Sequence, residues 1–455
     1  MQQIDPSTYT IPYVYLLSTS IDAAVSATKG SRSLPQSVLP GGNLWSLITN
    51  ALLSFDAIQV RYVGAQFNKI IEVVYHGAEQ TSNYIPAVQL LQNAILRLDP
   101  TSSTLSITHS YFVKLCLYAR AYVEATTIID RPVYHVPTSE STKTLEGRLS
   151  RYPCSVQESS FGYINPQTGL SGKITTRIYL EYYLMGALCY IGTEQWKKAQ
   201  AFLEVVLVTP SQQNVASLIM LEAYKKWLLV GLLIDGNGSL PPRSMNGNAL
   251  KHIRILAKPY ECVVDAFRTN KQDTLRAEIQ EGLEQWRQDG NYGLMSEVFQ
   301  ASRKFAVIRL GKTFAALSVE EVAQRTSSDP ADRQETLTYV QDLVTTGALQ
   351  AQILPATRPG SIGTIRFLAS TAAQKPEAQV EQELAMKATE LKILLKHISD
   401  YDHQLEVNRD YLEWLQKAKK ARDQEKKLGQ TGGTKPPGPP GPAMLDDEED
   451  MMEEW

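Results

Sequence analysis

Histidine is the side chain that most often ligates a metal or transfers a proton at neutral pH, so its positions are the first place to look for chemistry. The chain has six histidines, spread along its length: His76, His109, His135, His252, His397 and His403. The sequence contains no His-Glu-x-x-His segment, and no His-x-His pair stands before a suitably placed aspartate, so neither common hydrolytic zinc pattern is available. His397 and His403 are six residues apart, which puts them on different faces of a helix. We expect structural or surface histidines and no metal site.

The glycine-rich segments match neither a phosphate-binding loop nor a nucleophile elbow. Gly236-Asn237-Gly238 lacks the third glycine of a dinucleotide-binding loop and has no strand before it. The Gly-Gly-Thr-Lys segment that ends at Lys435 lacks the spacing of a P-loop, and no Gly-x-Ser-x-Gly segment occurs. The sequence therefore predicts that the protein is not an enzyme and has no catalytic residue and no cofactor.

Length and composition are typical of a globular protein with more than one structural unit. At 455 residues the chain exceeds the usual size of a single core, and it is 43% hydrophobic and 20% charged. Its net charge of −3 argues against bulk affinity for nucleic acid or an anionic membrane. The longest apolar segments are far too short to span a bilayer. The expected partners therefore include neither nucleic acid nor a membrane.

The cysteines and the first residues bear on the compartment. Cys116, Cys154, Cys189 and Cys262 lie dozens of residues apart without a Cys-x-x-Cys pair. Cys116 and Cys189 fall within apolar helical patterns, so buried thiols in a reducing compartment are expected. The first 20 residues contain no Lys or Arg, which argues against a signal peptide. We expect a protein of the cytoplasm and nucleus.

The first half of the chain is predicted to be helical and repetitive. Apolar residues recur at helical spacing from about Asn43 to Thr209, and the alternation typical of strands is almost absent there. Residues 137–173 are rich in Ser, Thr, Gly and Pro and are predicted to form a long loop. After it, Ile178 to Pro210 matches one tetratricopeptide-like helical hairpin, best at Gly186 and Phe202. One hairpin cannot bury its own apolar face, so we expect stacked helical pairs beside it.

Residues 291–346 are predicted to form three successive helices. Residues 291–317 show the periodicity of one amphipathic helix. Ser318, with Glu321 three residues later, matches the capping box of a second helix. Pro330 opens a third helix, which should run to Thr346.

The segment that follows is predicted to be a hairpin. Gly347 can take the left-handed conformation that ends a helix. Residues 348–354 then alternate, with Leu349, Ala351 and Ile353 on one face. A turn rich in Pro and Gly leads to a second short strand at 364–368. Three helices followed by a hairpin is the order of a winged helix.

A further helix and an acidic tail are expected at the C-terminal end. Pro376 opens a helix whose apolar residues follow spacings of three and four, with Asp402 interrupting the series. Asn408 can cap another helix. From Gly429 the chain is rich in Pro and Gly and should form no core, and seven of the nine residues from Asp446 to Glu454 are acidic.

Charge decides what a winged helix is expected to bind. Such domains often place their third helix in the major groove of DNA. Here that helix carries Arg333 against Asp332, Glu335 and Asp342, a net charge of −2 and the wrong sign for approaching phosphates. Residues 299–370 as a whole hold eight basic and six acidic residues, which is only mildly positive. Protein is therefore the expected partner.

Two charged segments have more than one reading. The lysine-rich run at 416–427 can be a solvated helix end or a site that attracts an acidic partner. The acidic tail can be a solubilising extension, or a short element whose Met451, Met452 and Trp455 dock into a basic pocket.

The order of these elements resembles the PCI family, a scaffold class found in the proteasome lid, the COP-nine signalosome and initiation factor three. Residues 291–325, 339–353 and 405–412 are similar to the signalosome subunit-three family, which shares the Asn-aromatic-Gly-Leu entry and the Arg-Leu-x-Lys-Thr-Phe segment. Val407-Asn408-Arg409 departs from a common Val-Asn-Pro, and the acidic extension is a second departure. The close resemblance covers about 291–415, and upstream it extends only to helical layout.

The resemblance implies a mostly α fold: a helical-repeat solenoid merges into a C-terminal winged helix, the PCI domain, and a long C-terminal helix and a disordered acidic tail follow. The implied domains are N-terminal helical repeats at 1–177, repeats leading into the PCI domain at 178–298, the winged helix at 299–370, bundle helices at 375–428 and the tail at 429–455.

The resemblance also implies a non-catalytic scaffold in a complex that removes a ubiquitin-like modifier from cullin-RING ubiquitin ligases. The implied partners are other PCI subunits and the core that holds the metalloprotease, with cullin-RING ligases contacted indirectly. Two alternatives stay open: a paralogous scaffold subunit of the proteasome lid, and a PCI nucleic-acid adaptor.

Family members associate through winged-helix edges and through a bundle of C-terminal helices. The implied edge residues are Leu349, Gln350, Ala351, Gln352, Ile353, Ile365, Phe367 and Leu368. The implied bundle residues are Leu384, Leu391, Leu394, Leu395, Ile398 and Leu405.

Overall fold

The protein is described from a computed structural model in which the chain forms two compact units, Met1–Gln374 and Lys375–Trp455. The described residues are 4–27, 33–137, 155, 159–210, 217–326, 333–355, 363–368, 377–406, 412–413, 415–417 and 419–420.

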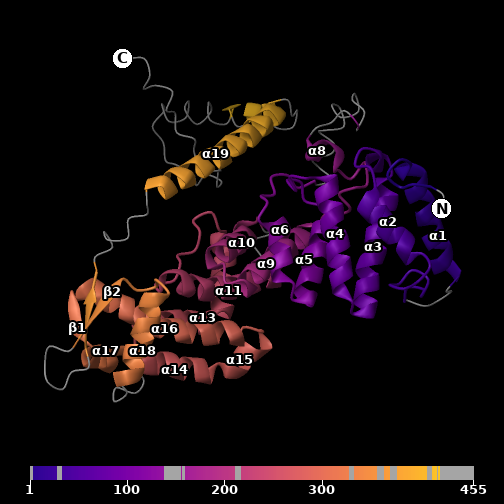
Figure 1. Ribbon diagram of the computed structural model, residues 1–455. Coiled ribbons are helices and arrows are strands. Elements are labelled where there is room, and N and C mark those ends of the chain that lie inside the picture. Colours follow the sequence, from indigo (N-terminus) through magenta and orange to yellow (C-terminus); the bar gives the residue numbers. More distant parts are fainter. Residues whose placement is uncertain are drawn as a thin grey trace. The chain divides into compact units, whose positions relative to one another are not determined.

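The first unit begins with helices that pack against their neighbours, either the next helix in the chain or one further along it (Figure 1). One buried apolar cluster extends from Tyr13 in the first helix to Val298, so these helices share a continuous core. The elements are α1 Thr10–Ala27, α2 Trp45–Ser54, the 3-10 helix Gln59–Tyr62, α3 Gly64–Thr81, α4 Tyr84–Leu98, α5 Ile107–Ala119, α6 Tyr122–Ile129, α8 Ser160–Tyr163, α9 Thr176–Gly192, α10 Trp196–Val208 and α11 Leu218–Asp235.

The tetratricopeptide-like hairpin is formed by α9 and α10, which pack against each other. Gly186 of α9 lies against the ring of Phe202 of α10, where an added Cβ would stand 2.8 Å from the ring. A larger residue at 186 would push the two helices apart. The glycine and the aromatic residue of the sequence pattern therefore act as a pair that sets the spacing of the hairpin.

The prediction of a long loop over 137–173 is confirmed for residues 164–173, which form no helix or strand, and the short helix α8 is the exception among the described residues. Residues 159–172 include α8, and Tyr163 and Leu170 are buried in the core. The Tyr163 hydroxyl donates to the Leu98 carbonyl at 3.0 Å, and the Arg61 guanidinium lies 3.6 Å from the centre of the Tyr163 ring. A composition rich in turn residues does not exclude burial when tertiary partners satisfy the backbone. Residues 138–154 and 156–158 lie outside the described residues.

His109, in the first turn of α5, is fully buried between two serines. The Ser106 backbone N–H donates to its Nδ1 at 3.2 Å, so Nδ1 is an acceptor, and Nε2–H then donates to the Ser102 hydroxyl 2.7 Å away. Protonating the ring would destroy the first of these bonds. Burial lowers the pKa of His109 to about 4, although the charge of Asp99 acts in the opposite direction.

His109 should therefore make the protein less stable at acid pH. Its unfolded-state pKa is near 6.5 and its folded pKa is lower, so below about pH 6.5 the unfolded chain binds a proton that the folded chain does not. The contribution of His109 to the free energy of unfolding is fully present above about pH 6.5, and it falls by about 2 kcal/mol between that pH and about pH 5. Urea unfolding above about pH 6.5 and at about pH 5 measures this fall in the free energy of unfolding. The His109→Gln variant should lack this part of the pH dependence, and an equal loss in both proteins would contradict the assignment to His109.

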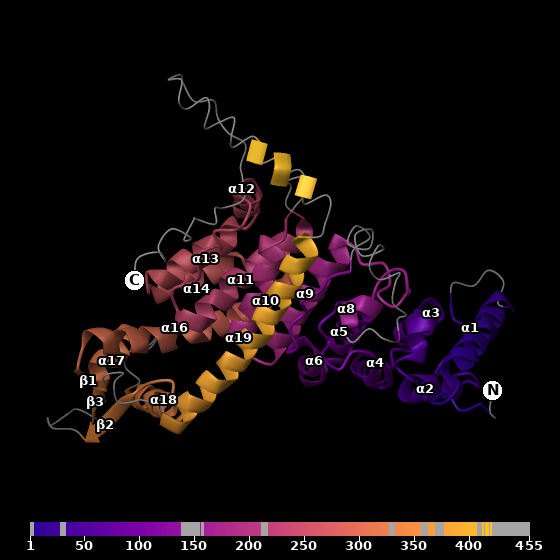
Figure 2. The same cartoon turned by 90° about the horizontal axis from the view of Figure 1, so that it is seen from above.

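After α11, four helices lead to a small sheet domain. They are α12 Gly247–Leu256, α13 Lys258–Arg268, α14 Gln272–Glu281 and α15 Leu283–Gln288. The long helix α16 Tyr292–Thr313 follows and belongs to both parts. Its Met295 and Val298 complete the solenoid core, whereas its Val307 belongs to the core of the sheet domain. The sheet lies at the far end of α16 from the solenoid (Figure 2). A helix shared by two cores joins them without a flexible linker.

The sheet domain has the winged-helix order. Its elements after α16 are β1 Ala316–Ser318, α17 Val319–Thr326, α18 Arg333–Thr345, β2 Ala351–Pro355 and β3 Gly363–Phe367. The three strands are antiparallel in the order β1-β3-β2. Its core is Val307, Leu317, Val319, Val322, Val340, Leu343, Leu349, Ala351, Ile365 and Phe367.

The predicted capping features of this domain are confirmed. The Ser318 backbone N–H donates to the Glu321 carboxylate and the Glu321 N–H donates to the Ser318 hydroxyl, both at 3.3 Å, which is a capping box. Gly347 has φ +72°, the left-handed conformation that ends α18. The predicted start of this helix at Pro330 lies outside the described residues.

The prediction of one helix from 291 to 317 is wrong at its end. The helix stops at Thr313, and Ala316–Ser318 forms β1, which pairs with β3 in the register Leu317 to Ile365. The local periodicity favours a helix through residue 317. Residues 316–318 form a strand instead, because they pair with β3, which lies almost fifty residues further along the chain.

In the second unit, α19 Glu377–Glu406 is the predicted C-terminal helix. The boundary between the units falls at Gln374, close to the expected start of the bundle segment at 375. The predicted domain boundaries remain predictions. The further helix expected after Asn408 lies mostly outside the described residues, as does the tail.

Candidate partner-binding surfaces

β2 is an edge strand with its outer backbone free of the sheet. Leu368 N–H donates to the Gln350 carbonyl at 2.9 Å, and the antiparallel ladder alternates from there. The N–H and C=O groups of Ala351 and Ile353 therefore point away from β3. The Gln352 side chain is exposed, whereas Leu349 and Ala351 are buried in the winged-helix core. This edge can bind another strand through its main chain, while its apolar side chains hold the domain together.

β3 cannot serve as an edge, and this corrects the assignment of residues 365–368 to a partner-binding edge. β3 lies between β1 and β2 and pairs with both. Ile365 and Phe367 are buried in the core of the domain. Of the three predicted edge residues in this range, only Leu368, which is 37% exposed, has its side chain at the surface, beside the exposed Arg366. Sequence alternation locates both strands of a hairpin but does not say which of them a third strand covers.

The predicted stripe on α19 is exposed. Leu384, Leu391, Leu394, Leu395 and Ile398 are between 43% and 65% exposed. Leu405 lies within the helix, but its side chain is outside the described residues. Apolar side chains at spacings of three and four along one helix form a continuous stripe, which is buried when another helix packs on it. Val380, Met386 and Ile393 are also exposed, so the apolar surface of α19 is wider than the predicted stripe.

A buried polar network joins the solenoid to the start of α16. The Lys225 ammonium of α11 lies 2.7 Å from the Asp289 carboxylate, and the side chains are only 12% and 24% exposed. The Tyr260 hydroxyl of α13 donates to the same carboxylate oxygen at 2.7 Å and accepts from the Asn291 amide at 2.8 Å. Burial opposes ionisation of Asp289, but the hydrogen bonds from Lys225 and Tyr260 hold its pKa below the ordinary value. Asn291 opens the Asn-aromatic-Gly-Leu segment, so this network accounts for the asparagine of the motif.

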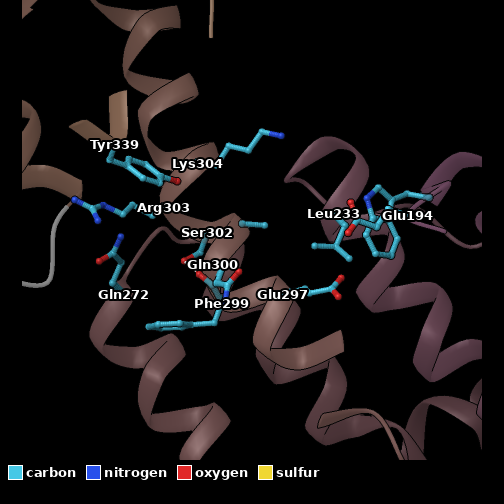
Figure 3. A pocket seen from close by; sticks show the side chains of 12 residues that line it. Glu194, Leu233, Gln272, Glu297, Phe299, Gln300, Ser302, Arg303, Lys304 and Tyr339 are labelled. Atoms are coloured by element: carbon cyan, nitrogen blue, oxygen red, sulfur yellow. Dashed lines mark hydrogen bonds between the residues drawn. The ribbon is translucent and has the colours of Figure 1, made fainter. Parts of the chain in front are cut away.

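A groove of about 730 Å³ lies along the middle of α16, lined by residues from Glu297 to Lys304 among others, and the sequence does not predict it. Figure 3 shows Arg303 and Tyr339 on one side of it and Leu233 with Glu194 on the other. The Arg303 guanidinium lies 4.4 Å from the centre of the Tyr339 ring and 2.8 Å from the Glu335 carboxylate. On the opposite side, burial and then the charge of Glu194 raise the pKa of Glu297. The residues that line the groove come from helices that are far apart in the sequence. No local sequence pattern therefore predicts the groove.

The described part of the winged helix does not present a basic recognition helix. Arg333 of α18 lies 3.8 Å from the Glu320 carboxylate, and Glu335 pairs with Arg303. The described residues place no three His, Cys, Asp or Glu side chains so that they could hold a metal ion, and none of their helices is long and apolar enough to cross a membrane.

Comparison with known proteins identifies the family. Residues 1–246 match the family model described as COP9 signalosome complex subunit 3, N-terminal helical repeats. A relative from Emericella nidulans, named COP9 signalosome complex subunit 3, is 31% identical over 94% of this chain and 85% of its own length. The chain belongs to the COP9 signalosome subunit 3 family.

More distant members of the family carry the same name. The relative from Neurospora crassa is 26% identical over 94% of this chain and 84% of its own length. The relative from Drosophila melanogaster is 23% identical over 78% of this chain and 72% of its own length. The resemblance to this family and the helical-repeat fold are thus confirmed. The view that the upstream half shares only helical layout is wrong, because that half matches the family model directly.

Proposed function

We propose that this chain is a scaffold subunit of the COP9 signalosome, a complex that removes a ubiquitin-like modifier from cullin-RING ubiquitin ligases. The observation that carries the proposal is similarity to subunit 3 proteins along 94% of the chain. The test is affinity purification of the tagged full-length chain, with mass spectrometry of the proteins that copurify. Signalosome subunits should be recovered together. Recovery of the proteasome lid instead would favour the paralogous reading and overturn this one.

We propose that the chain itself is not the catalytic subunit. Its relatives are named as subunits of a complex, and the metalloprotease would be a different chain. The purified chain, supplied with zinc, should leave a modified cullin intact. Metal-dependent cleavage that is lost when His397 or His403 is replaced would overturn this proposal.

Two surfaces are proposed to hold the chain in the complex: the open edge of β2 and the stripe on α19. The first would add a strand from another PCI subunit, and the second would pack in a bundle of C-terminal helices. The backbone of Ala351 and Ile353, which points away from β3, and the exposure of the α19 leucines support these roles. The other PCI subunits and the metalloprotease-containing core are the proposed partners.

Replacing Ile353 by Pro should weaken assembly through β2. Proline removes one outward N–H, and its ring obstructs an incoming strand. The loss should be roughly tenfold in affinity, the equivalent of about one hydrogen bond. Ile353→Ala is the matched control, because it removes the half-buried side chain but keeps the N–H. Coexpression with partner subunits and quantitative pull-down measures both variants. Equal recovery of partners by the two variants would show that the edge is not used.

The proposed location is the cytoplasm and nucleus, where the thiol pool is reducing. Cys116 and Cys189 are free and buried. Burial raises the pKa of the Cys116 thiol and raises that of Cys189 to about 12, so both stay protonated and poorly reactive. Cell fractionation of the tagged chain tests the location, and enrichment in a secretory compartment would contradict it.

A further inference from the structure

One face of α16 forms a wall of the groove described above, which we call the α16 groove. Four lining residues of this helix are spaced by three and four, so they lie on one side of it. They are Glu297, Gln300, Ala301 and Lys304. The opposite wall comes from the solenoid and includes Trp196 and Leu233. All of these residues belong to the first compact unit, so both walls are parts of the same unit.

The α16 groove carries opposite charges at its two ends. Glu297 and Lys304 are seven residues apart on α16, which separates the two ends by about 10 Å. Figure 3 shows both side chains extending from α16 to the same side, that of Leu233 and Glu194. Neither Glu297 nor Lys304 forms an ion pair with a side chain of the described residues. The charges at both ends are therefore available to a ligand.

Two carboxylates share the acidic end of the α16 groove. Burial and then the charge of Glu194 raise the pKa of Glu297, so the two carboxylates are close enough to repel each other. Glu194 also forms no ion pair with a side chain of the described residues. A cation between the two carboxylates would remove this repulsion. A protein ligand supplies such a cation as the side chain of a lysine or an arginine.

The rest of the lining favours a protein segment over nucleic acid. Ala301 lies between the two charged positions of α16, and the half-buried Trp196 and Leu233 form an apolar opposite wall. Phosphates would be repelled by the two carboxylates of the acidic end. The volume of about 730 Å³ is in the range of sites that hold small ligands or short segments. A distance of about 10 Å corresponds to two turns of a helix or about three residues of an extended segment.

We propose that the α16 groove binds a segment of another protein chain that carries a Lys or Arg and an Asp or Glu about 10 Å apart, with an apolar side chain between them. The basic side chain lies between Glu194 and Glu297, and the acidic side chain pairs with Lys304. The apolar side chain packs against Trp196 and Leu233. The groove shares no residue with the β2 edge or the α19 stripe, so this proposal does not depend on the roles proposed for those two surfaces.

Site-specific photocrosslinking in the full-length protein tests the proposal. The photoreactive amino acid benzoylphenylalanine replaces Gln300, which is exposed and lines the groove, in tagged chain expressed in cells that contain its partners. Mass spectrometry should identify a crosslinked segment of a different chain that carries both charges and an apolar residue between them. The same replacement at Lys312, which is exposed on α16 outside the groove, is the control.

Three results of this experiment would overturn the proposal. The first is a crosslink yield at position 300 no higher than at position 312. The second is a crosslinked segment that lacks either charge. The third is a crosslink to a second copy of this chain. The same spectra identify the copurifying complex separately, so a failure of the signalosome assignment can be told apart from a failure of the groove.

Charge reversal tests the contact at the acidic end. Glu194→Lys with Glu297→Lys should lower the crosslink yield at position 300 at least about tenfold, because the basic residue of the ligand would meet two cations. Replacing that basic residue of the ligand by Glu should restore the yield. Glu281→Lys with Glu284→Lys is the control, because both carboxylates are exposed outside the groove and the change in charge is equal. Failure of the combined variant to regain the yield overturns the contact.

The variant Glu194→Gly separates binding from folding. Glu194 has φ +58°, a conformation that glycine adopts with less strain. The variant should therefore resist urea unfolding at least as well as the unchanged protein. Its crosslink yield at position 300 should nevertheless fall at least about threefold, because one of the two carboxylates is lost. An undiminished yield overturns the proposed binding of a cation between Glu194 and Glu297.

Discussion

Removal of the chain after Gln374 should leave a soluble, folded protein that no longer joins its complex. The cut falls at the boundary between the two compact units, so the solenoid and the winged helix keep both of their cores. Their free energy of unfolding should therefore change little. The removed unit contains the α19 stripe, whose five described residues are between 43% and 65% exposed. Burying a leucine or isoleucine fully contributes roughly 1.5–3 kcal/mol, so the stripe can supply much of an interface before ordering costs.

Two substitutions should act like the truncation. Leu391→Glu with Leu395→Glu places two charges in the stripe, where a packed partner would have to desolvate them. We expect association to weaken by roughly 100-fold or more, which is about 2.7 kcal/mol. Gln382→Glu with Thr389→Glu is the control, because it adds the same charge on the opposite face of the helix. That variant should assemble nearly normally.

Size-exclusion chromatography with coexpressed partner subunits measures assembly, and urea unfolding measures stability. If the truncated chain still elutes with the full complex, α19 is not an assembly element and the edge of β2 must act alone. If the truncated chain unfolds much more easily, the stripe is covered within the chain itself.

Replacing Asp289 by Ala should destabilise the junction between the solenoid and the winged helix. The substitution leaves the Lys225 ammonium, which is 12% exposed, without its carboxylate and leaves the Tyr260 hydroxyl without its acceptor. An uncompensated buried charge is costly, and we expect a loss of roughly 3 kcal/mol in the free energy of unfolding. Urea unfolding at neutral pH measures this loss.

The double variant Lys225→Met with Asp289→Ala separates the buried charge from the rest of the network. Removing both charged partners leaves no unpaired ion, so the double variant should recover at least half of the stability that Asp289→Ala loses. Lys197→Met is the control for loss of an exposed lysine, and it should leave stability nearly unchanged. A double variant as unstable as Asp289→Ala would show that the tyrosine contact, not the ion pair, dominates.

Much of the fold was determined by local patterns that a single segment carries. The capping box at Ser318 and Glu321, the left-handed Gly347 and the hairpin around Gly186 and Phe202 all depend on residues within one or two helical turns or one helical hairpin. Such features involve short loops and little closure entropy, so sequence spacing is enough to specify them. The family could be recognised because its motifs are local in the same sense.

Only the tertiary structure decided which of the strands is an edge. β1 is three residues long and pairs with a strand about fifty residues away, which places β3 in the centre of the sheet and leaves β2 open. The alternation of apolar and polar residues along a strand shows which face is buried, but it does not show how many other strands pair with that strand. Sequence alternation therefore predicts Ile365 and Phe367 at a surface, whereas both side chains belong to the core.

Local sequence patterns also do not predict the polar network at the start of α16 or the burial of the loop that contains Tyr163. The physical reason is the same, because both depend on residues far apart in the chain. Lys225, Tyr260 and Asp289 come from three separate helical segments, and Tyr163 meets Leu98 from a segment whose composition predicts a loop. By itself the sequence determined the helices, their caps and the apolar stripe of α19. Tertiary packing decided which polar groups are buried and which backbone stays open, because those outcomes depend on partners that lie far apart in the chain and meet only when the cores form.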